Sequence, residues 1–224
     1  MHRYQILMEY VGTNFYGWQY QKKQITIQGT VEKTLKKILK EKVKLYGSGR
    51  TDSKVHAIEQ SAHFDVKNKI NNIKKFFNTL NYFLNGKFIT VVKIKKRPLT
   101  FHARYSAKKR IYKYLIHNRE SLPSINRDRG WYVRKKLDYK LIKKASHFLK
   151  GTHDLSVFRA SNCSASSPIR TIDSLIIKKN NDIIEIKIKS RSFLKQQVRS
   201  IVGCLKYVGE KKWTINKFKK VIKS

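Results

Sequence analysis

The sequence predicts an α/β (α+β) fold of two ferredoxin-like halves that form one mostly antiparallel sheet, with helices on one side and a basic cleft between the halves. Hydrophobic residues switch repeatedly between the two-residue period of strands and the roughly 3.6-residue period of helices. The resulting order is β-α-β-β-α-β in residues 1–97, and β-α-β-β-α without a closing strand in residues 98–224. No low-complexity linker separates the halves, so we expect their sheets to join.

The first half begins with a strand over residues 3–11, where apolar and polar side chains alternate. Tyr4, Ile6 and Met8 share the face that we expect to be buried. A loop over 12–24 follows, and from Gln28 the apolar side chains recur at the spacing of a helix. The same two periods predict the remaining elements of this half: strands at 43–46, 62–66 and 88–95, and a second helix over 70–84.

The second half begins with a strand over 111–116. Asp138 is placed to cap a helix, and Gly151 is placed to end it. The remaining predicted elements are strands at 172–178 and 183–190 joined by an Asn-Asn-Asp turn, a long helix over 194–208, and a short helix near 214–222.

The charge of the chain points to a polyanionic partner. Lys and Arg total 51 against 14 Asp and Glu among 224 residues, a formal net charge of +37. Nucleic acid is the commonest partner of so basic a surface. Lys, Ile and Asn are all abundant, as AT-rich coding sequence produces, so we attribute part of the excess to composition alone.

Several classes of protein are excluded by what the sequence lacks. No apolar run is long enough to span a membrane, and the first residues lack the apolar core of a signal peptide. Cys163 and Cys204 are too few for a disulfide framework and show no metal-ligand spacing. No glycine-rich loop for a nucleotide cofactor occurs. We therefore expect a cytoplasmic protein without a metal or a cofactor.

Asp52 is the carboxylate most suited to chemistry. It lies in the loop 47–56 (GSGRTDSKVH) between two predicted strands, with cations on both sides that favour its ionised form. Such a carboxylate can act as a nucleophile or a general base. From spacing alone, the more common alternative is a turn residue that accepts hydrogen bonds from loop amides.

Other candidate groups allow both structural and functional interpretations. His56, His63 and His102 could serve a metal-free ribonuclease, although scattered histidines more often have structural positions. Lys195 and Arg199 lie four residues apart on the long helix and suit a phosphate or carboxylate, or simply solvent. Tyr112 and Tyr114 could stack on a base, but strand tyrosines more often pack in a core.

The motifs, taken together, resemble the TruA family of tRNA pseudouridine synthases. Segment 49–52 (GRTD) with 55–57 (VHA) resembles the family's GRTDAGVHA signature. The other similar segments follow in family order: 16–19 (YGWQ) with Gln21, 101–107 (FHARYSA), 112–114 (YKY), 151–159 (GTHDLSVFR) and 193–203 (FLKQQVRSIVG). These matches span nearly the whole chain, so their joint signal is specific.

The resemblance implies a cofactor-free isomerisation of uridine to pseudouridine in the tRNA anticodon stem-loop, at tRNA positions 38–40. Asp52 matches the catalytic aspartate, and Arg199 matches the arginine that pairs with it and orients it. Tyr112 would stack on the flipped uracil. The resemblance also implies substrate-binding residues, a tRNA partner and a homodimer; the substrate-binding residues are Arg50, Thr51, His56, Arg104, Tyr114 and Lys195.

Three departures from the family pattern leave an alternative open. Ser53-Lys54 replace the family's alanine-glycine, so a positive φ there would fall on Lys54. Gln197 replaces a methionine. The sequence stops before the family's closing strand, so we expect an unpaired sheet edge that the 214–222 helix partly covers. The alternative is a tRNA- or RNA-binding protein that has lost its activity.

Overall fold

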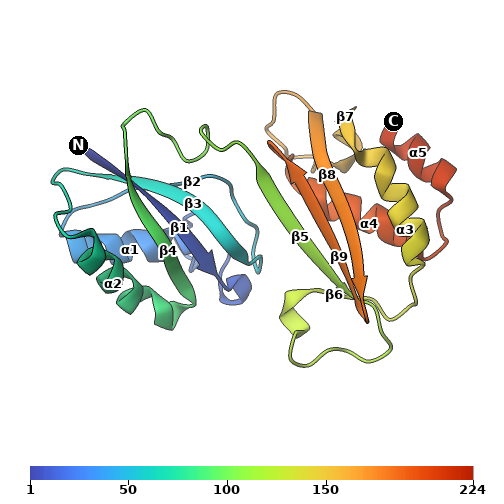
Figure 1. Ribbon diagram of the computed structural model, residues 1–224, viewed down its shortest axis with the longest axis horizontal. Coiled ribbons are helices and arrows are strands. Elements are labelled where there is room, and N and C mark those ends of the chain that lie inside the picture. Colours follow the sequence, from blue (N-terminus) through green and yellow to red (C-terminus); the bar gives the residue numbers. More distant parts are fainter. Residues whose placement is uncertain (224) are drawn as a thin grey trace. The chain divides into compact units, whose positions relative to one another are not determined.

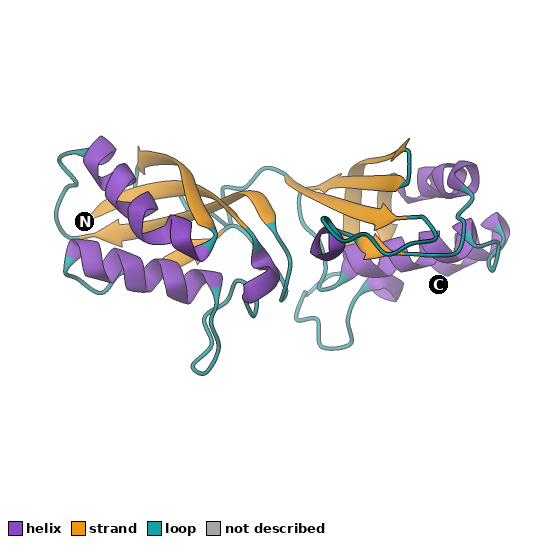
Figure 2. Cartoon of the chain, turned by 90° about the horizontal axis from the view of Figure 1, so that it is seen from below, coloured by secondary structure: helices purple, strands orange, loops and turns teal. Residues whose placement is uncertain are grey.

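A computed structural model describes residues 1–223, which form two compact units. The first unit is Met1–Ala107, and the second begins at Lys108. Each unit contains its own sheet and its own hydrophobic core, and helices gather on one side of each sheet (Figures 1 and 2). The predicted α/β class is confirmed.

The first unit has the predicted β-α-β-β-α-β order. Its elements are β1 (His2–Tyr10), α1 (Ile27–Leu39), β2 (Leu45–Gly47), β3 (Ala57–Val66), α2 (Ile73–Leu84) and β4 (Ile89–Arg97). The strands form an antiparallel sheet in the order β2-β3-β1-β4. The alternation along β1 sets the two faces: Tyr4, Ile6 and Met8 are buried beneath the helices, while Arg3 and Gln5 lie on the open face.

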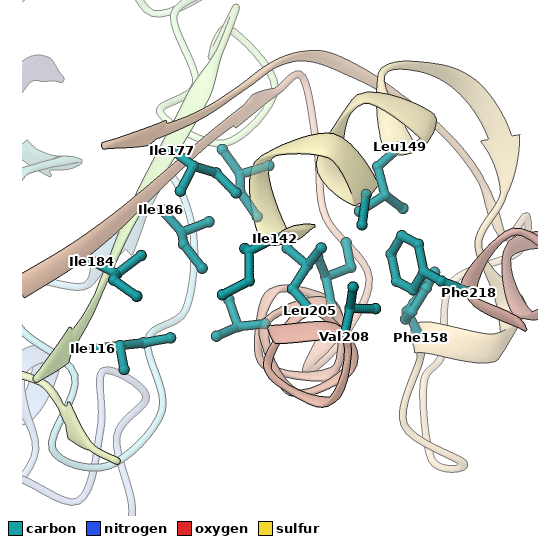
Figure 3. Packing of buried hydrophobic residues seen from close by; sticks show 14 of the residues in the cluster. Ile116, Ile142, Leu149, Phe158, Ile177, Ile184, Ile186, Leu205, Val208 and Phe218 are labelled. Carbon is teal, nitrogen blue, oxygen red and sulfur yellow. The ribbon is translucent and has the colours of Figure 1, made fainter. Parts of the chain in front are cut away.

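Residues 108–223 of the second unit contain five strands and three α-helices. They are β5 (Arg110–His117), β6 (Trp131–Tyr132), α3 (Tyr139–Ser146), β7 (Gly151–Asp154), β8 (Ile169–Asn180), β9 (Ile183–Ser190), α4 (Gln197–Gly209) and α5 (Ile215–Lys223). The sheet order is β6-β5-β9-β8-β7. Figure 3 shows Leu205 and Val208 of α4 pointing toward Ile142 of α3, with Ile184 and Ile186 of β9 lining the same core.

The expectation of one joined sheet needs correction, because the described residues form two hydrogen-bonded sheets, one in each unit. The ladder of β4 ends at Arg97, and the next residue, Pro98, has no backbone N–H to donate. The Phe101 N–H then donates to the Pro98 carbonyl, which turns the chain away from the strand direction.

Gly151 does not end a helix as predicted. Helix α3 begins after Asp138, whose carboxylate accepts the Leu141 N–H as expected, but it ends at Ser146. A short 3₁₀ turn, His147–Leu149, follows, and Gly151 starts strand β7 with φ +108°. Strands β6 and β7 were not predicted, because two to four residues are too few to show a period.

The last helix packs at one edge of the second sheet. Helix α5 contacts α3, α4 and β7, and β7 is the edge strand at the end of the sheet opposite β6. Phe218 and Ile222 of α5 are buried in the core shared with Leu149 and Phe158 (Figure 3). An apolar stripe on so short a helix docks where it excludes most water, and here that place is the helix layer. No helix within residues 1–223 is both long and apolar enough to cross a membrane.

Candidate active site

The loop that carries Asp52 connects β2 to β3 in the first unit and is anchored at both ends. Its start is held by a hydrogen bond from the Ser48 N–H to the Ser61 carbonyl, and the Gln60 side chain donates to the Gly49 carbonyl at 2.5 Å. Near its centre, the Val55 N–H donates to the Asp52 carbonyl at 3.2 Å. Asp52 itself is exposed on this ordered loop, so its carboxylate is accessible to a large substrate.

The segment between β1 and α1 clamps this loop from the side. The Phe15 carbonyl accepts hydrogen bonds from the Ser53 hydroxyl at 3.1 Å and the Lys54 N–H at 3.3 Å. On the other side of Asp52, the Trp18 N–H donates to the Thr51 carbonyl at 2.9 Å. Two sequence motifs that lie far apart along the chain, YGWQ and GRTD, thus form a single structural unit around Asp52.

Three glycines make this close approach possible, and their role was not predicted. A Cβ on Gly12 would lie 2.1 Å from the Val55 carbonyl oxygen, and one on Gly17 would lie 2.8 Å from the Thr51 carbonyl oxygen. A Cβ on Gly47 would lie 2.6 Å from the buried Trp18 ring. Only a residue without a side chain fits at these positions. Gly17 stands in the YGWQ motif and Gly12 in the predicted loop 12–24, and neither signal showed that a second backbone segment lies against these glycines.

The predicted substrate-binding residues of this loop differ in their surroundings. The Thr51 hydroxyl is 2.9 Å from the Tyr10 hydroxyl, and the His56 Nδ1 accepts the Gly12 N–H at 3.2 Å. These contacts hold the loop in place. Arg50 is exposed, two residues before Asp52.

Lys54 takes the left-handed backbone conformation, with φ +64°. This is the conformation that we expected to fall on it where the family has glycine. A side chain costs about 1 kcal/mol or more in this region. Lys54 is exposed, so its ammonium remains in solvent on the same loop as Asp52.

The segment after β4 folds over the open face of the first sheet and presents Arg104. His63 of β3 stacks on Tyr46 of β2 at 5.0 Å between ring centroids and meets the His102 ring at 4.7 Å. The Ala103 N–H donates to His63 Nδ1 at 3.1 Å, and Ala103 is buried. Arg104 follows on this anchored segment and is exposed.

An ion pair holds the same segment from its other side. Both guanidinium donors of Arg3 that face Asp65 make hydrogen bonds of 2.7 Å to its carboxylate, and the remaining Nη1 donates to the Leu99 and Phe101 carbonyls. His63 and His102 therefore have structural positions among the described residues. The metal-free ribonuclease hypothesis gains no support from them.

We expect the stability of the first unit to fall below pH 6.5 because of His63. Only 1% of this residue is exposed, and burial, with Arg3 and His102 nearby, lowers its pKa to about 4. Because the folded pKa lies below the ordinary value of 6.5, protonation favours the unfolded chain. The free energy of unfolding should reach its maximum above pH 6.5 and be lower by about 2 kcal/mol at pH 5.

Urea unfolding at pH 7.5, 6 and 5 measures this dependence. His63→Gln keeps an acceptor for the Ala103 N–H and should flatten the dependence, whereas His153→Gln, in the second unit, should preserve it. If the free energy of unfolding of His63→Gln still falls with pH as steeply as that of the unmodified protein, His63 is not the cause of the pH dependence. Below about pH 4, protonation of Asp65 adds to the loss, because its hydrogen bond to Arg3 lowers the pKa of that carboxyl.

In the second unit, Tyr112 and Tyr114 lie two residues apart on β5, and Tyr114 is close enough to Arg199 for its charge to act on the tyrosine. The ring of Tyr112 meets Phe193 edge to face, with 5.1 Å between centroids. Both tyrosines lie on the helix side of the sheet, in register with the buried Ile188 and Ile186 of β9. Burial raises the pKa of Tyr114, and the charge of Arg199 acts in the opposite direction.

The two polar positions near the start of α4 differ in exposure. Lys195 is exposed, as a contact to phosphate requires. Gln197 is fully buried: its Oε1 accepts the Leu194 N–H at 2.7 Å, and its Nε2 has no hydrogen-bond partner among the described residues. Its amide thus caps the turn that enters α4. The stretch 1–223 contains no group of three or more His, Cys, Asp or Glu side chains suited to a metal ion.

Comparison with known proteins extends the similarity over almost the full length. The family model described as tRNA pseudouridine synthase matches residues 6–106 and 145–224. The chain is 59% identical to tRNA pseudouridine synthase A of Pelagibacter ubique, covering 100% of this chain and 91% of that protein. It is 45% identical to the protein of the same name from Thermoanaerobacter sp. over 93% and 85% of the two chains. The identity to the Sinorhizobium medicae protein of that name is 40%, over 96% and 87%.

Proposed function

The chain belongs to the tRNA pseudouridine synthase family, and we propose that it modifies uridines of the anticodon stem-loop with Asp52 as its catalytic residue. It is an isomerase that converts uridine in tRNA to pseudouridine. The observation that carries the catalytic assignment is the position of Asp52, exposed at the centre of a loop that is hydrogen-bonded on both of its sides. A non-catalytic RNA-binding protein is not favoured.

The reaction exchanges one bond for another within the nucleotide. The bond between ribose C1′ and uracil N1 breaks, a bond between C1′ and C5 forms, and the C5 hydrogen leaves as a proton while N1 gains one. The carboxylate of Asp52 acts as nucleophile or as general base in this exchange. We assign Arg199 the role of pairing with Asp52, and Tyr112 the role of stacking on the displaced uracil.

Binding of the tRNA rests on shape and charge. A base must leave its stack before it can react, so the enzyme has to hold both the displaced nucleotide and the surrounding backbone. We propose that Arg50, Arg104 and Lys195 contact the phosphates of the tRNA backbone, since all three are exposed. Thr51, His56 and Tyr114 shape the site around them. We also propose that the enzyme works in the cytoplasm as a homodimer, with tRNA contacting both subunits; light scattering of the purified protein tests the dimer.

Tritium release from tRNA labelled at uracil C5 tests the proposed substrate. In a set of transcripts, each anticodon stem-loop uridine is replaced by cytidine, one at a time. Tritium release should fall only in the transcripts that lack a modified uridine. A transcript with its anticodon stem-loop intact and its uridines elsewhere replaced should keep full release. Release that comes from uridines outside the stem-loop would overturn the proposed site of modification.

A further inference from the structure

Residues 16–25 form a small aromatic lobe between β1 and α1 whose largest side chains face solvent. Tyr16 is 56% exposed and Tyr20 is 57% exposed, although their neighbours Phe15 and Trp18 are buried. No ring-to-ring contact of Tyr16 or Tyr20 occurs within residues 1–223. Large exposed aromatic surface next to a catalytic loop is suited to contact a ligand.

The backbone of the lobe is held firmly, so its rings are presented on a rigid support. The Tyr16 N–H donates to the Ile25 carbonyl at 2.9 Å, and the Tyr16 carbonyl accepts the Gln21 side-chain amide at 3.0 Å. The Tyr20 N–H donates to Oε1 of Gln28 at 2.9 Å. Binding a base on such a support costs little conformational entropy.

Tyr16 belongs to the segment whose backbone packs against the loop that carries Asp52. The residue before it, Phe15, is hydrogen-bonded to Ser53 and Lys54, and two residues after it Trp18 is hydrogen-bonded to Thr51. These bonds flank Asp52 on both sides. The intervening Gly17 packs its Cα against the backbone of residues 51–53. Because Phe15 points into the core from extended backbone, the ring of Tyr16 emerges on the opposite, solvent side of the segment that packs against the Asp52 loop.

Tyr20 is oriented by the start of α1. A Cβ on Gly29 would lie 3.0 Å from the ring carbon Cδ2 of Tyr20, so the ring rests on the glycine backbone with its other side exposed. Lys22 and Lys23, both exposed, follow at the tip of the lobe. Aromatic rings next to cations form the combination that binds unpaired nucleotides: rings stack on bases, and ammonium groups contact phosphates.

We propose that Tyr16 stacks on an unpaired base next to the target uridine, and that Tyr20 stacks on a further base while Lys22 and Lys23 contact the backbone. This inference rests on the proposed function. Removing the target uridine from its stack deprives neighbouring bases of a partner, and the lobe replaces that partner. Tyr16 is therefore a substrate-binding residue that lies outside the GRTD loop.

A binding cycle on synthetic anticodon stem-loops tests the stacking. Tyr16→Ala should weaken binding about 5- to 150-fold, and Tyr16→Phe, which keeps the ring, should bind like the unmodified protein. Tyr82→Ala is the matched control, since Tyr82 is 81% exposed on α2. The stem-loop is then made with one abasic nucleotide at a time on either side of the target. At the nucleotide that Tyr16 contacts, Tyr16→Ala should cause no further loss.

The outcomes separate this inference from the proposed function. The stacking proposal is wrong if Tyr16→Ala binds the stem-loop normally, or if it weakens binding by the same factor on every abasic RNA. If the unmodified enzyme still forms pseudouridine in the stem-loop, the proposed function stands. If no pseudouridine forms in the stem-loop, the proposed site of modification is wrong, and the same cycle on whole tRNA still decides whether Tyr16 stacks. Circular dichroism of each variant confirms that the fold is intact.

Discussion

Replacing Asp52 by asparagine is expected to abolish pseudouridine formation, with a fall in turnover of at least about 10³-fold. An amide has nearly the same shape as a carboxylate, but it can act neither as a nucleophile toward the nucleotide nor as a base. Asp52 is exposed, and hydrogen bonds of Thr51, Ser53 and Lys54 also hold its loop, so the fold should survive the change. Tritium release under single-turnover conditions measures the loss.

The affinity for tRNA separates a chemical role of Asp52 from a structural one. Asp52→Asn should bind tRNA at least as tightly as the unmodified enzyme, because it removes a negative charge from a surface that we propose contacts phosphates. Asp182→Asn, in the turn between β8 and β9, is the control and should leave turnover unchanged. Wild-type turnover in Asp52→Asn would show that the catalytic assignment is wrong.

Arg199 can be tested through its dependence on Asp52. If it orients that carboxylate, Arg199→Ala should lower turnover in the presence of Asp52 but cause no further loss in the Asp52→Asn background. Independent, additive losses would instead assign Arg199 a contact to the RNA.

Replacing Gly17 by alanine is expected to lower turnover about 10²-fold without touching a catalytic group. The backbone of Gly17 has φ +88°, and an added Cβ would lie 2.8 Å from the Thr51 carbonyl oxygen and 3.2 Å from the Asp52 carbonyl carbon. The two segments must therefore separate, which displaces Asp52 from its position. The strained φ and the steric overlap together should also lower the free energy of unfolding by about 1–3 kcal/mol.

Gly86→Ala provides the matched control for Gly17→Ala. No atom lies within 4 Å of a Cβ at Gly86, which is in the turn between α2 and β4. It should keep its turnover and its stability. If Gly17→Ala folds and retains full turnover, the close packing of the YGWQ segment does not position Asp52, and the Tyr16 proposal loses its geometric basis as well.

The elements of the fold could be predicted because their signals are local. The alternation along β1 and the helical spacing of α1 each depend on residues only a few positions apart in the sequence. Asp138 caps α3 as expected, because a side chain and an amide three residues later are neighbours in any helix. The family resemblance likewise needs only short motifs, and it correctly indicated a tRNA pseudouridine synthase.

Tertiary structure alone decided the features that depend on residues far apart in the sequence. Periodicity does not show which strands share hydrogen bonds. The strand pairing does, and it divides the described residues into two sheets. The burial of His63 beneath the 98–107 segment and the docking of α5 on β7 have no local signature. The same holds for the active loop: Gly12 and Gly17 look like ordinary loop glycines until the backbones of residues 51–55 lie against them. Steric exclusion between segments acts only after the chain has folded. For that reason the sequence could propose Asp52 as a candidate, but only the structure revealed what holds its loop in place.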